Sequence, residues 1–141
     1  MTRRTAGAED LAFLLELRVI TMEEHQHNSG TALTPEQQRT RVLDHYECAE
    51  IVEMDGVPIG LWKVVRTPTE WKLSQVQLLP SHQGAGIGSS LVHSLIVEAR
   101  AGGVPLILNV LRANPARRLY ERLGFRVIGE TQHTFHMRHE G

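Results

Sequence analysis

A glycine-rich turn is the feature of this sequence whose residue types point most directly to chemistry. It runs from Gln83 to Ser89 and precedes the most strongly helical segment of the chain. Glycines allow a phosphate to approach the backbone closely, and the free N–H groups at a helix N-terminus attract anions. The turn therefore predicts a phosphate site, although a tight turn that simply requires small residues explains the glycines equally well.

Two other phosphate motifs do not fit this turn. A dinucleotide fingerprint requires a further glycine where this sequence has Ser89, and a P-loop requires a lysine after Gly88. The ligand class therefore has to come from the surrounding elements.

Those elements follow from hydrophobic periodicity and turn residues. Strands are expected at 49–54, 57–65 and 71–79, the first two joined by a tight turn at Asp55-Gly56. A helix with its apolar stripe from Ile87 to Ala99 should end at Gly102-Gly103. The remaining expectations are helices at 11–24, 34–45 and 114–123, a loop at 25–33, and strands at 106–110, 125–130 and 134–138. The result is a mixed α/β sheet whose strand-helix-strand unit over 71–110 is parallel and right-handed.

Composition limits the classes of protein that this chain can represent. Its 141 residues, 41% of them hydrophobic, suit one domain, and its single cysteine can form no internal disulfide. A net charge of −1 lacks the basic footprint of a nucleic-acid binder, and neither a membrane span nor a signal peptide is evident. We therefore expect a cytoplasmic protein. Residues 1–70 carry a net charge of −5 and residues 71–141 a net charge of +4, which would suit an anionic ligand in the second half and a cationic one near the first.

Two blocks of this sequence carry recognisable motifs. The segment from Leu78 to Gly88 contains Gln83, Gly86 and Gly88, and the segment from Asn114 to Phe125 contains Asn, Ala, Leu-Tyr and Gly-Phe. The first resembles the acetyl-CoA signature of the GCN5-related N-acetyltransferase (GNAT) family, with Gln83, Gly86 and Gly88 at its three defining places, and the second resembles another block of the same family. The resemblance covers the chain from about residue 48 to its end and implies a single domain with a splayed central strand pair and helices on both faces of the sheet.

The resemblance implies a binding site for acetyl-CoA that consists mainly of backbone. Pantetheine would pair with the free edge of the strand before the turn, and an N–H group near Leu78 would polarise the thioester carbonyl. The pyrophosphate would lie on the glycine turn. The implied cofactor-binding residues are Val76, Gln77, Leu78, Gln83, Gly84, Ala85, Gly86, Ile87, Gly88, Ser89 and Asn114.

Tyr120 is the implied catalytic residue, because the family's tyrosine at this place lies near the thioester sulfur and can protonate the leaving thiolate. It also shares an apolar helix face with Ala116 and Leu123, so a purely structural role stays open. Asn114 has two compatible roles, as the start of a helix and as a cofactor contact. Arg117 and Arg118 either meet phosphates or are solvated.

The general base is not indicated by any single residue. One branch of the family has a Glu where this sequence has Asn109, and an amide cannot accept a proton. Water, or the cluster of Glu23, Glu24, His25 and His27, could take its place, although solvated surface explains that cluster as well. His25 and His27 could suggest a metal site, but residues i and i+2 do not share a helix face, so we expect no metal site. His133, His136 and His139 are expected on strand or tail surface, and Trp62 and Trp71 either line the acceptor pocket or pack the sheet.

The sequence thus predicts an acetyl-CoA-dependent N-acetyltransferase that acts on a primary amine of a small molecule or peptide by direct attack. A catalytically silent acyl-CoA-binding module is one alternative. A structural or interaction protein of the same fold, paired as a homodimer through its C-terminal strands, is another.

Overall fold

The computed structural model describes residues 1–29, 34–84 and 86–140, with the backbone alone for residues 21–29. Its strands are β1 (Thr2–Thr5), β2 (Ala49–Met54), β3 (Val57–Arg66), β4 (Trp71–Leu78), β5 (Leu106–Leu111), β6 (Arg126–Glu130) and β7 (Thr134–His139). Its helices are α1 (Leu11–Ser29), α2 (Pro35–Leu43), α3 (Ile87–Gly102) and α4 (Ala116–Arg122), with short 3-10 turns η1 (Ala8–Asp10), η2 (Tyr46–Cys48) and η3 (Pro80–His82).

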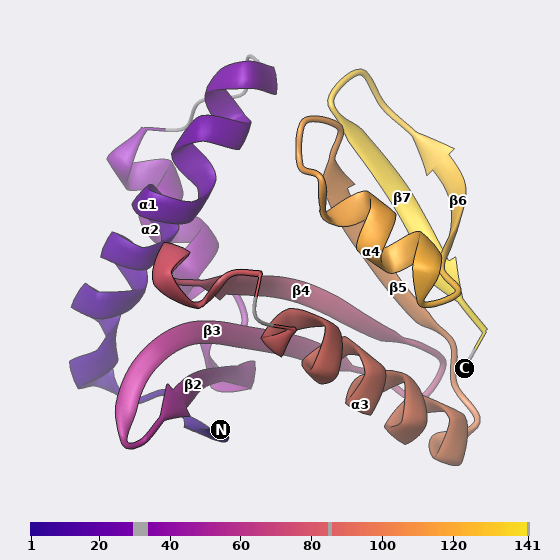
Figure 1. The fold of residues 1–141 in the computed structure, drawn as a ribbon, viewed down its shortest axis with the longest axis horizontal. Coiled ribbons are helices and arrows are strands. Elements are labelled where there is room, and N and C mark those ends of the chain that lie inside the picture. The colour runs from indigo at the N-terminus through magenta and orange to yellow at the C-terminus, as the bar shows by residue number, and fades with distance from the viewer. Residues whose placement is uncertain (30–33, 85, 141) are drawn as a thin grey trace.

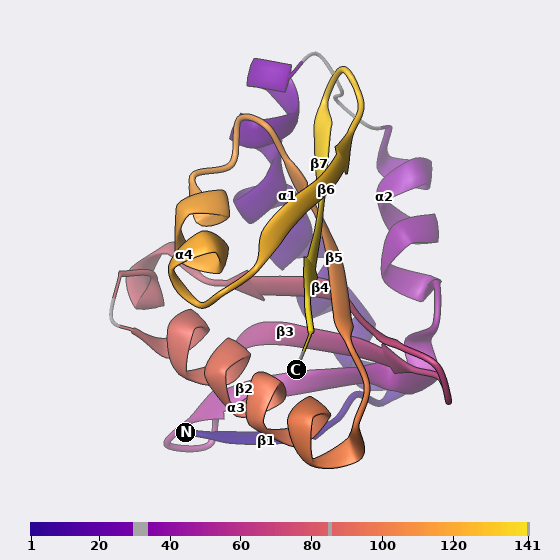
Figure 2. The same cartoon turned by 90° about the vertical axis from the view of Figure 1, so that its right-hand side faces the viewer.

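The strands form one mixed sheet in the order β1-β2-β3-β4-β5-β7-β6. The β4–β5 pair is parallel, as the strand-helix-strand pattern predicts, and the other neighbouring pairs are antiparallel. Helices α1 and α2 stand on one side of the sheet and α3 and α4 on the other (Figure 1). Figure 2 shows the β5–β7–β6 part of the sheet turned away from the β1–β4 part.

Two apolar clusters fix this arrangement, one on each face of the sheet. The larger joins the inner face of α3, including Leu91, Leu95 and Ile96, to strand residues such as Leu106. The smaller joins α1 and α2 to β2 and β3 through residues that include Leu14, Leu17 and Val42. The expected mixed α/β sheet with helices on both faces is confirmed. The physical reason is that each apolar helix stripe must be buried against a face of the sheet.

Strands β4 and β5 separate after a short stretch of pairing. Their ladder holds three residue pairs, from Trp71–Leu106 to Leu73–Leu108. Beyond this point β4 continues along β3 to Leu78, and β5 continues along β7 to Leu111. The expected splay is therefore present, and it leaves one edge of each strand without a strand partner.

Local signals in the sequence explain most element boundaries. Asp55 and Gly56 both have positive φ, as a two-residue hairpin turn requires. Thr34 and Gln37 form a reciprocal capping box at the start of α2, and Gly103 ends α3 in the left-handed region.

Two expectations are wrong. The helix expected to end at residue 24 continues to Ser29, since no Gly or Pro interrupts it, so the expected loop begins later; its residues 30–33 lie outside the described part of the chain. Strand β1 was not predicted, because a short Thr-Arg-Arg-Thr segment shows no apolar alternation. It pairs with β2 as an edge strand, where polar residues are tolerated.

Candidate active site

The divergence of β4 and β5 opens a cleft of about 590 Å³. Its floor comes from Lys72–Gln77 of β4 and Leu108–Leu111 of β5, one wall from α1 and α2, and the other from α4 and the strand β7 with the loop before it. Figure 1 shows α1 on one side and the α4–β7 unit on the other side of the space above β4, and residues of all these elements line the cleft. Four of the predicted site residues line it, namely Val76, Gln77, Asn114 and Tyr120.

The free edge of β4 presents backbone donors to the cleft. The Leu79 N–H donates to the Ile59 carbonyl of β3 at 2.8 Å. Because successive N–H groups of a strand point to opposite edges, those of Val76 and Leu78 face away from β3, toward the splay. The Leu78 carbonyl on that edge accepts a hydrogen bond from the Gln83 side-chain amide at 2.9 Å. Gln83 thus holds the end of β4 against the glycine turn.

The glycine turn lies beside the cleft, between η3 and α3. Gly84 and Gly86 have φ of +78° and +79°, and a Cβ atom at either position would meet no atom within 4 Å. The space over the turn is therefore open, while the backbone conformation favours glycine. Among the described residues no side chain caps the N-terminus of α3, so the first N–H groups of this helix can bind a ligand. Ile87 is buried in the core and Ser89 is half-buried, whereas Ala85 lies outside the described residues.

Tyr120 combines the two roles that the sequence left open. Its ring is buried in the larger apolar cluster, and it packs edge-on against Phe125 with ring centroids 5.7 Å apart. The same residue lines the cleft. Burial raises the pKa of the Tyr120 hydroxyl to about 12, so the group keeps its proton at neutral pH and is available as a donor.

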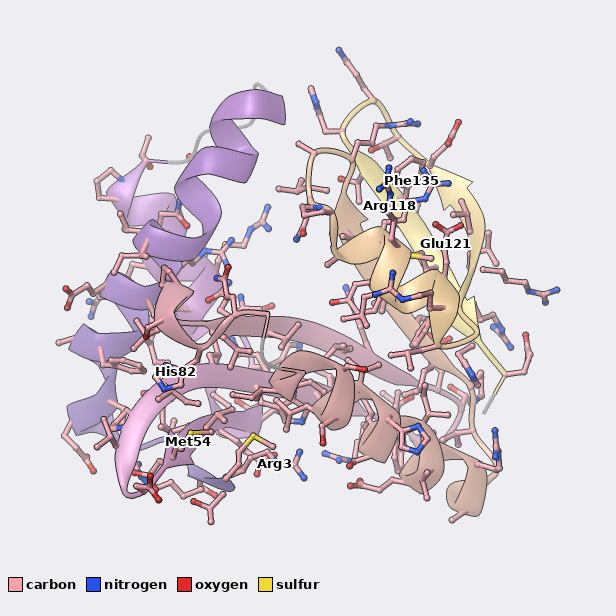
Figure 3. The ribbon with its side chains drawn as sticks, viewed as in Figure 1. Arg3, Met54, His82, Arg118, Glu121 and Phe135 are labelled. Atoms are coloured by element: carbon pink, nitrogen blue, oxygen red, sulfur yellow. The ribbon has the colours of Figure 1, made fainter. Side chains whose placement is uncertain are left out.

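Asn114 and Arg117 are engaged in contacts within the protein, whereas Arg118 is exposed. The Asn114 side-chain oxygen accepts the Ala116 N–H at 2.9 Å at the start of α4. Arg117 stacks on the Phe135 ring at 4.1 Å and pairs with Glu121 at 3.3 Å. Arg118, Glu121 and Phe135 all lie on the α4–β7 unit, whereas His82 lies across the fold near η3 (Figure 3). Arg117 is half-buried and Arg118 is exposed.

His136 and Asn109 form a polar pair on the floor of the cleft. They are direct neighbours in the β5–β7 register, and His136 Nδ1 lies 2.6 Å from the Asn109 side-chain oxygen. An amide oxygen can only accept, so Nδ1 carries the proton and Nε2 of the neutral ring keeps its lone pair. His133 also lines the cleft. Both histidines were expected on strand or tail surface, and the surface on which they lie is the cleft lining. For His136 the sequence does contain a signal: the apolar residues Phe135 and Met137 on either side face the core, so His136 faces the opposite side of β7.

The opposite wall carries cationic side chains that the sequence did not single out. Arg18 of α1 is 3% exposed, and its Nε donates to the Gln38 side-chain oxygen at 2.5 Å. Arg41 of α2 also lines the cleft. Lys63 is fully buried below the end of α2 and donates to the carbonyls of Arg41, Val42 and Asp44 at 3.3, 2.9 and 2.5 Å. Burial lowers the pKa of Lys63.

The remaining candidates lie elsewhere. Trp62 is fully buried in the core and Trp71 packs under Arg66, so both serve the sheet. The side chains of Glu23, Glu24, His25 and His27 lie outside the described residues. Outside the cleft lining, His45, Glu47 and Cys48 bring potential ligand atoms within 4.8 Å of one another on a largely exposed turn. In the described part of the chain, no helix combines the length and apolar character that a membrane crossing requires.

Comparison with known proteins places this site in a family. The sequence profile described as FR47-like protein matches residues 61–135, more than half of the chain, and that segment includes β4, the glycine turn and Tyr120. The chain belongs to the GNAT family. Ribosomal protein bS18-alanine N-acetyltransferase of Haemophilus influenzae is 38% identical over 60 residues, which are 42% of this chain and 41% of that protein. The match thus spans about two fifths of this curated relative.

Solved structures share the fold of this GNAT protein over its whole length. The PaiA N-acetyltransferase of Thermoplasma acidophilum in complex with coenzyme A superimposes with a TM-score of 0.76 at 18% identity, covering 99% of this chain and 98% of that one. Protein PH1933 of Pyrococcus horikoshii also gives a TM-score of 0.76, at 15% identity and with the same coverage. At such identities the likeness establishes the fold alone.

Proposed function

We propose that this GNAT protein is an acetyl-CoA-dependent N-acetyltransferase that transfers an acetyl group to a primary amine by direct attack. The observation that carries this function is the cleft between the splayed strands, where Tyr120 and the free edge of β4 meet. We expect it to act in the cytoplasm on a small-molecule or peptide amine.

The residues present fit coenzyme A. The edge of β4 offers the Val76 and Leu78 N–H groups to an extended chain, in the manner of an added strand. The open space over Gly84 and Gly86 and the uncapped start of α3 suit a pyrophosphate. Acetyl-CoA supplies the thioester.

The cleft can assist both halves of the transfer. The amine nitrogen forms a bond to the acetyl carbon while the carbon–sulfur bond breaks, and a backbone N–H of the β4 edge stabilises the charge that develops on the carbonyl oxygen. Tyr120 gives its hydroxyl proton to the thiolate, and the proton of the attacking amine must leave to a base or to water.

Calorimetry with acetyl-CoA tests the binding half of this function. Gly86→Glu places a side chain and a negative charge over the turn, so we expect loss of binding in a folded protein. Gly103→Glu is the matched control, since Gly103 has φ of +68° with open space around it at the other end of α3. Unchanged affinity in Gly86→Glu would remove the turn from the site.

Turnover distinguishes an enzyme from a silent binding module. A screen of primary amines with acetyl-CoA, followed by release of free thiol, should find acceptors. Tight acetyl-CoA binding with no acceptor would favour the silent module. Sedimentation velocity tests the other alternative, a structural or interaction protein that pairs as a homodimer through its C-terminal strands.

A further inference from the structure

The α1–α2 wall holds a buried cation, Arg18. Arg18 is 3% exposed and lines the cleft, and Gln38 is the hydrogen-bond partner of its guanidinium. Within the described residues, neither Arg18 nor Arg41 forms an ion pair with a carboxylate. A guanidinium has five N–H donors, and the bond from Nε to Gln38 uses one of them.

The neighbouring charges do not neutralise it. Asp44 is the carboxylate among the described cleft-lining residues, but its side chain is 67% exposed, and one of its oxygens lies 4.0 Å from the His45 ring. Arg41 and Lys72 add positive charge to the lining. Burial, and then repulsion from Arg41, lower the pKa of Arg18 to about 10, the direction expected of a desolvated cation.

Two buried acceptors lie along the same side of the cleft. The side-chain oxygens of Gln75 and Gln77 have no hydrogen-bond partner among the described residues, and Gln77 is 6% exposed. The Gln75 amide donates to the Arg41 carbonyl at 2.9 Å, which fixes its orientation and places it next to α2. Unpaired buried oxygens favour a ligand that brings N–H groups.

We propose that the amine acceptor carries a carboxylate near its amino group, and that Arg18 and Arg41 bind this carboxylate while Gln75 and Gln77 face its N–H groups. The acceptor class is thus an amino acid or a compound of the same charge pattern. This inference rests on the proposed N-acetyltransferase function, since it assigns the second substrate of the same cleft. Arginine suits the task, because its fork matches the two carboxylate oxygens.

Calorimetry with reaction products tests this subsite without requiring turnover. The probes are a panel of N-acetyl amino acids, each paired with its carboxamide, titrated into the full chain with coenzyme A present. We expect at least one acid to bind about 10- to 100-fold more tightly than its amide, as charge-assisted hydrogen bonds would give. Arg18→Met and Arg41→Gln should each abolish most of this difference, while Arg39→Gln, on the same helix but outside the cleft lining, should retain it.

The outcomes separate this inference from the proposed function. Equal binding of acid and amide throughout the panel, or a difference that survives both substitutions, would overturn the carboxylate subsite even if amines are acetylated. Failure of coenzyme A to bind would count against the proposed function, and the acid–amide comparison would then be run without it. If Arg18→Met fails to fold, Arg41→Gln decides, because its side chain is exposed and its backbone bonds remain.

A second, independent observation concerns the base. His136 and Asn109 are adjacent across β5 and β7, and the 2.6 Å bond from Nδ1 leaves Nε2 as an acceptor at the cleft floor. We infer that His136 Nε2 accepts the proton of the attacking amine, with Asn109 as the residue that positions the ring. This assignment rests on the proposed function. His136 would serve as the base in place of the Glu that one branch of the family has at the position of Asn109.

Single-turnover rates with a competent amine test this role. His136→Ala should slow transfer by about 10²–10⁴-fold, and added imidazole should restore part of the rate. His93→Gln, at an exposed position of α3 outside the cleft lining, should leave the rate within about twofold, and acetyl-CoA affinity should be unchanged in both variants. An unaltered rate in His136→Ala, or a loss that imidazole cannot rescue, would refute the assignment. Absence of transfer by the wild type would instead refute the function itself.

Discussion

At the scale of single residues, Tyr120 shows how one side chain serves packing and chemistry through different atoms. The ring belongs to the core and the residue reaches the cleft. Tyr120→Phe keeps the ring, so we expect the free energy of unfolding and acetyl-CoA affinity to change little. The single-turnover rate should fall by about 10²–10⁴-fold if the hydroxyl protonates the thiolate.

The second tyrosine of the chain provides the control. Tyr46 donates its hydroxyl to the Gly7 carbonyl at 2.7 Å, away from the cleft lining, so Tyr46→Phe should cost about 1 kcal/mol of stability and leave the rate unchanged. Since the pKa of Tyr120 is raised to about 12, its proton is retained up to roughly pH 11, and the rate should show no alkaline loss from this group below that pH. An equal rate in Tyr120→Phe would return the residue to a structural role.

Lys63 illustrates a buried charge with a structural role. Its ammonium donates to three carbonyls at the end of α2, groups that a helix C-terminus leaves unsatisfied. Lys63→Met would remove this donor from the Val42 and Asp44 carbonyls, while the Arg41 carbonyl keeps its bond from Gln75. We therefore expect a loss of about 2–5 kcal/mol in the free energy of unfolding, measured with urea. Lys72→Met on the next strand should change it by less than about 1 kcal/mol. A stable Lys63→Met protein would show that other groups satisfy the end of α2.

At the scale of elements, periodicity and turn residues predicted most strands and helices, but not the cleft wall. Asp55-Gly56 and Gly103 end their elements because they adopt positive φ, a local preference that can be predicted from residue type. The pairing of Asn109 with His136, 27 residues later, depends on the register between β5 and β7, which no local sequence pattern contains. Arg18 reads as one more polar residue of an amphipathic helix, and only the packing of α1 against α2 reveals its burial. The splay itself was expected through family resemblance.

The close approach of β3 and β4 also sets the position of the cleft floor. A Cβ atom on Gly60 would lie 2.5 Å from the Gln77 carbonyl oxygen. Gly60→Ala must therefore push β4 away from β3, and we expect a loss of about 1–3 kcal/mol in stability together with weaker acetyl-CoA binding. Gly102→Ala is the matched control, because its nearest neighbour is 3.7 Å away and alanine favours the helix. Unaltered stability in Gly60→Ala would mean that the strands separate without cost.

At the scale of the whole molecule, the charge of a chain segment does not predict the charge of a surface that it forms. Residues 1–70 carry a net charge of −5, which suggested a cationic ligand nearby. The cleft-lining residues from this half are instead Arg18, Arg41 and Asp44. The other acidic side chains of this half that the structure describes lie outside the cleft lining, for example Asp10 and Glu53 in their bonds to Arg4. Local packing thus separates the site's charge from the average of its segment.

The same packing predicts how readily helix α2 of the α1–α2 wall opens compared with the rest of the fold. In α2 the buried residues are Gln38 and Val42, whereas α3 buries six residues against the sheet. Helix α2 should therefore open locally at a lower free energy than α3 or β5, which hydrogen exchange on peptides covering 35–43 would detect. Because Arg41 belongs to α2, a bound N-acetyl amino acid at 100 times its Kd should slow that exchange by about 100-fold when opening destroys the subsite. The amide should not. Equal protection by acid and amide would mean that α2 senses the ligand without contacting its carboxylate.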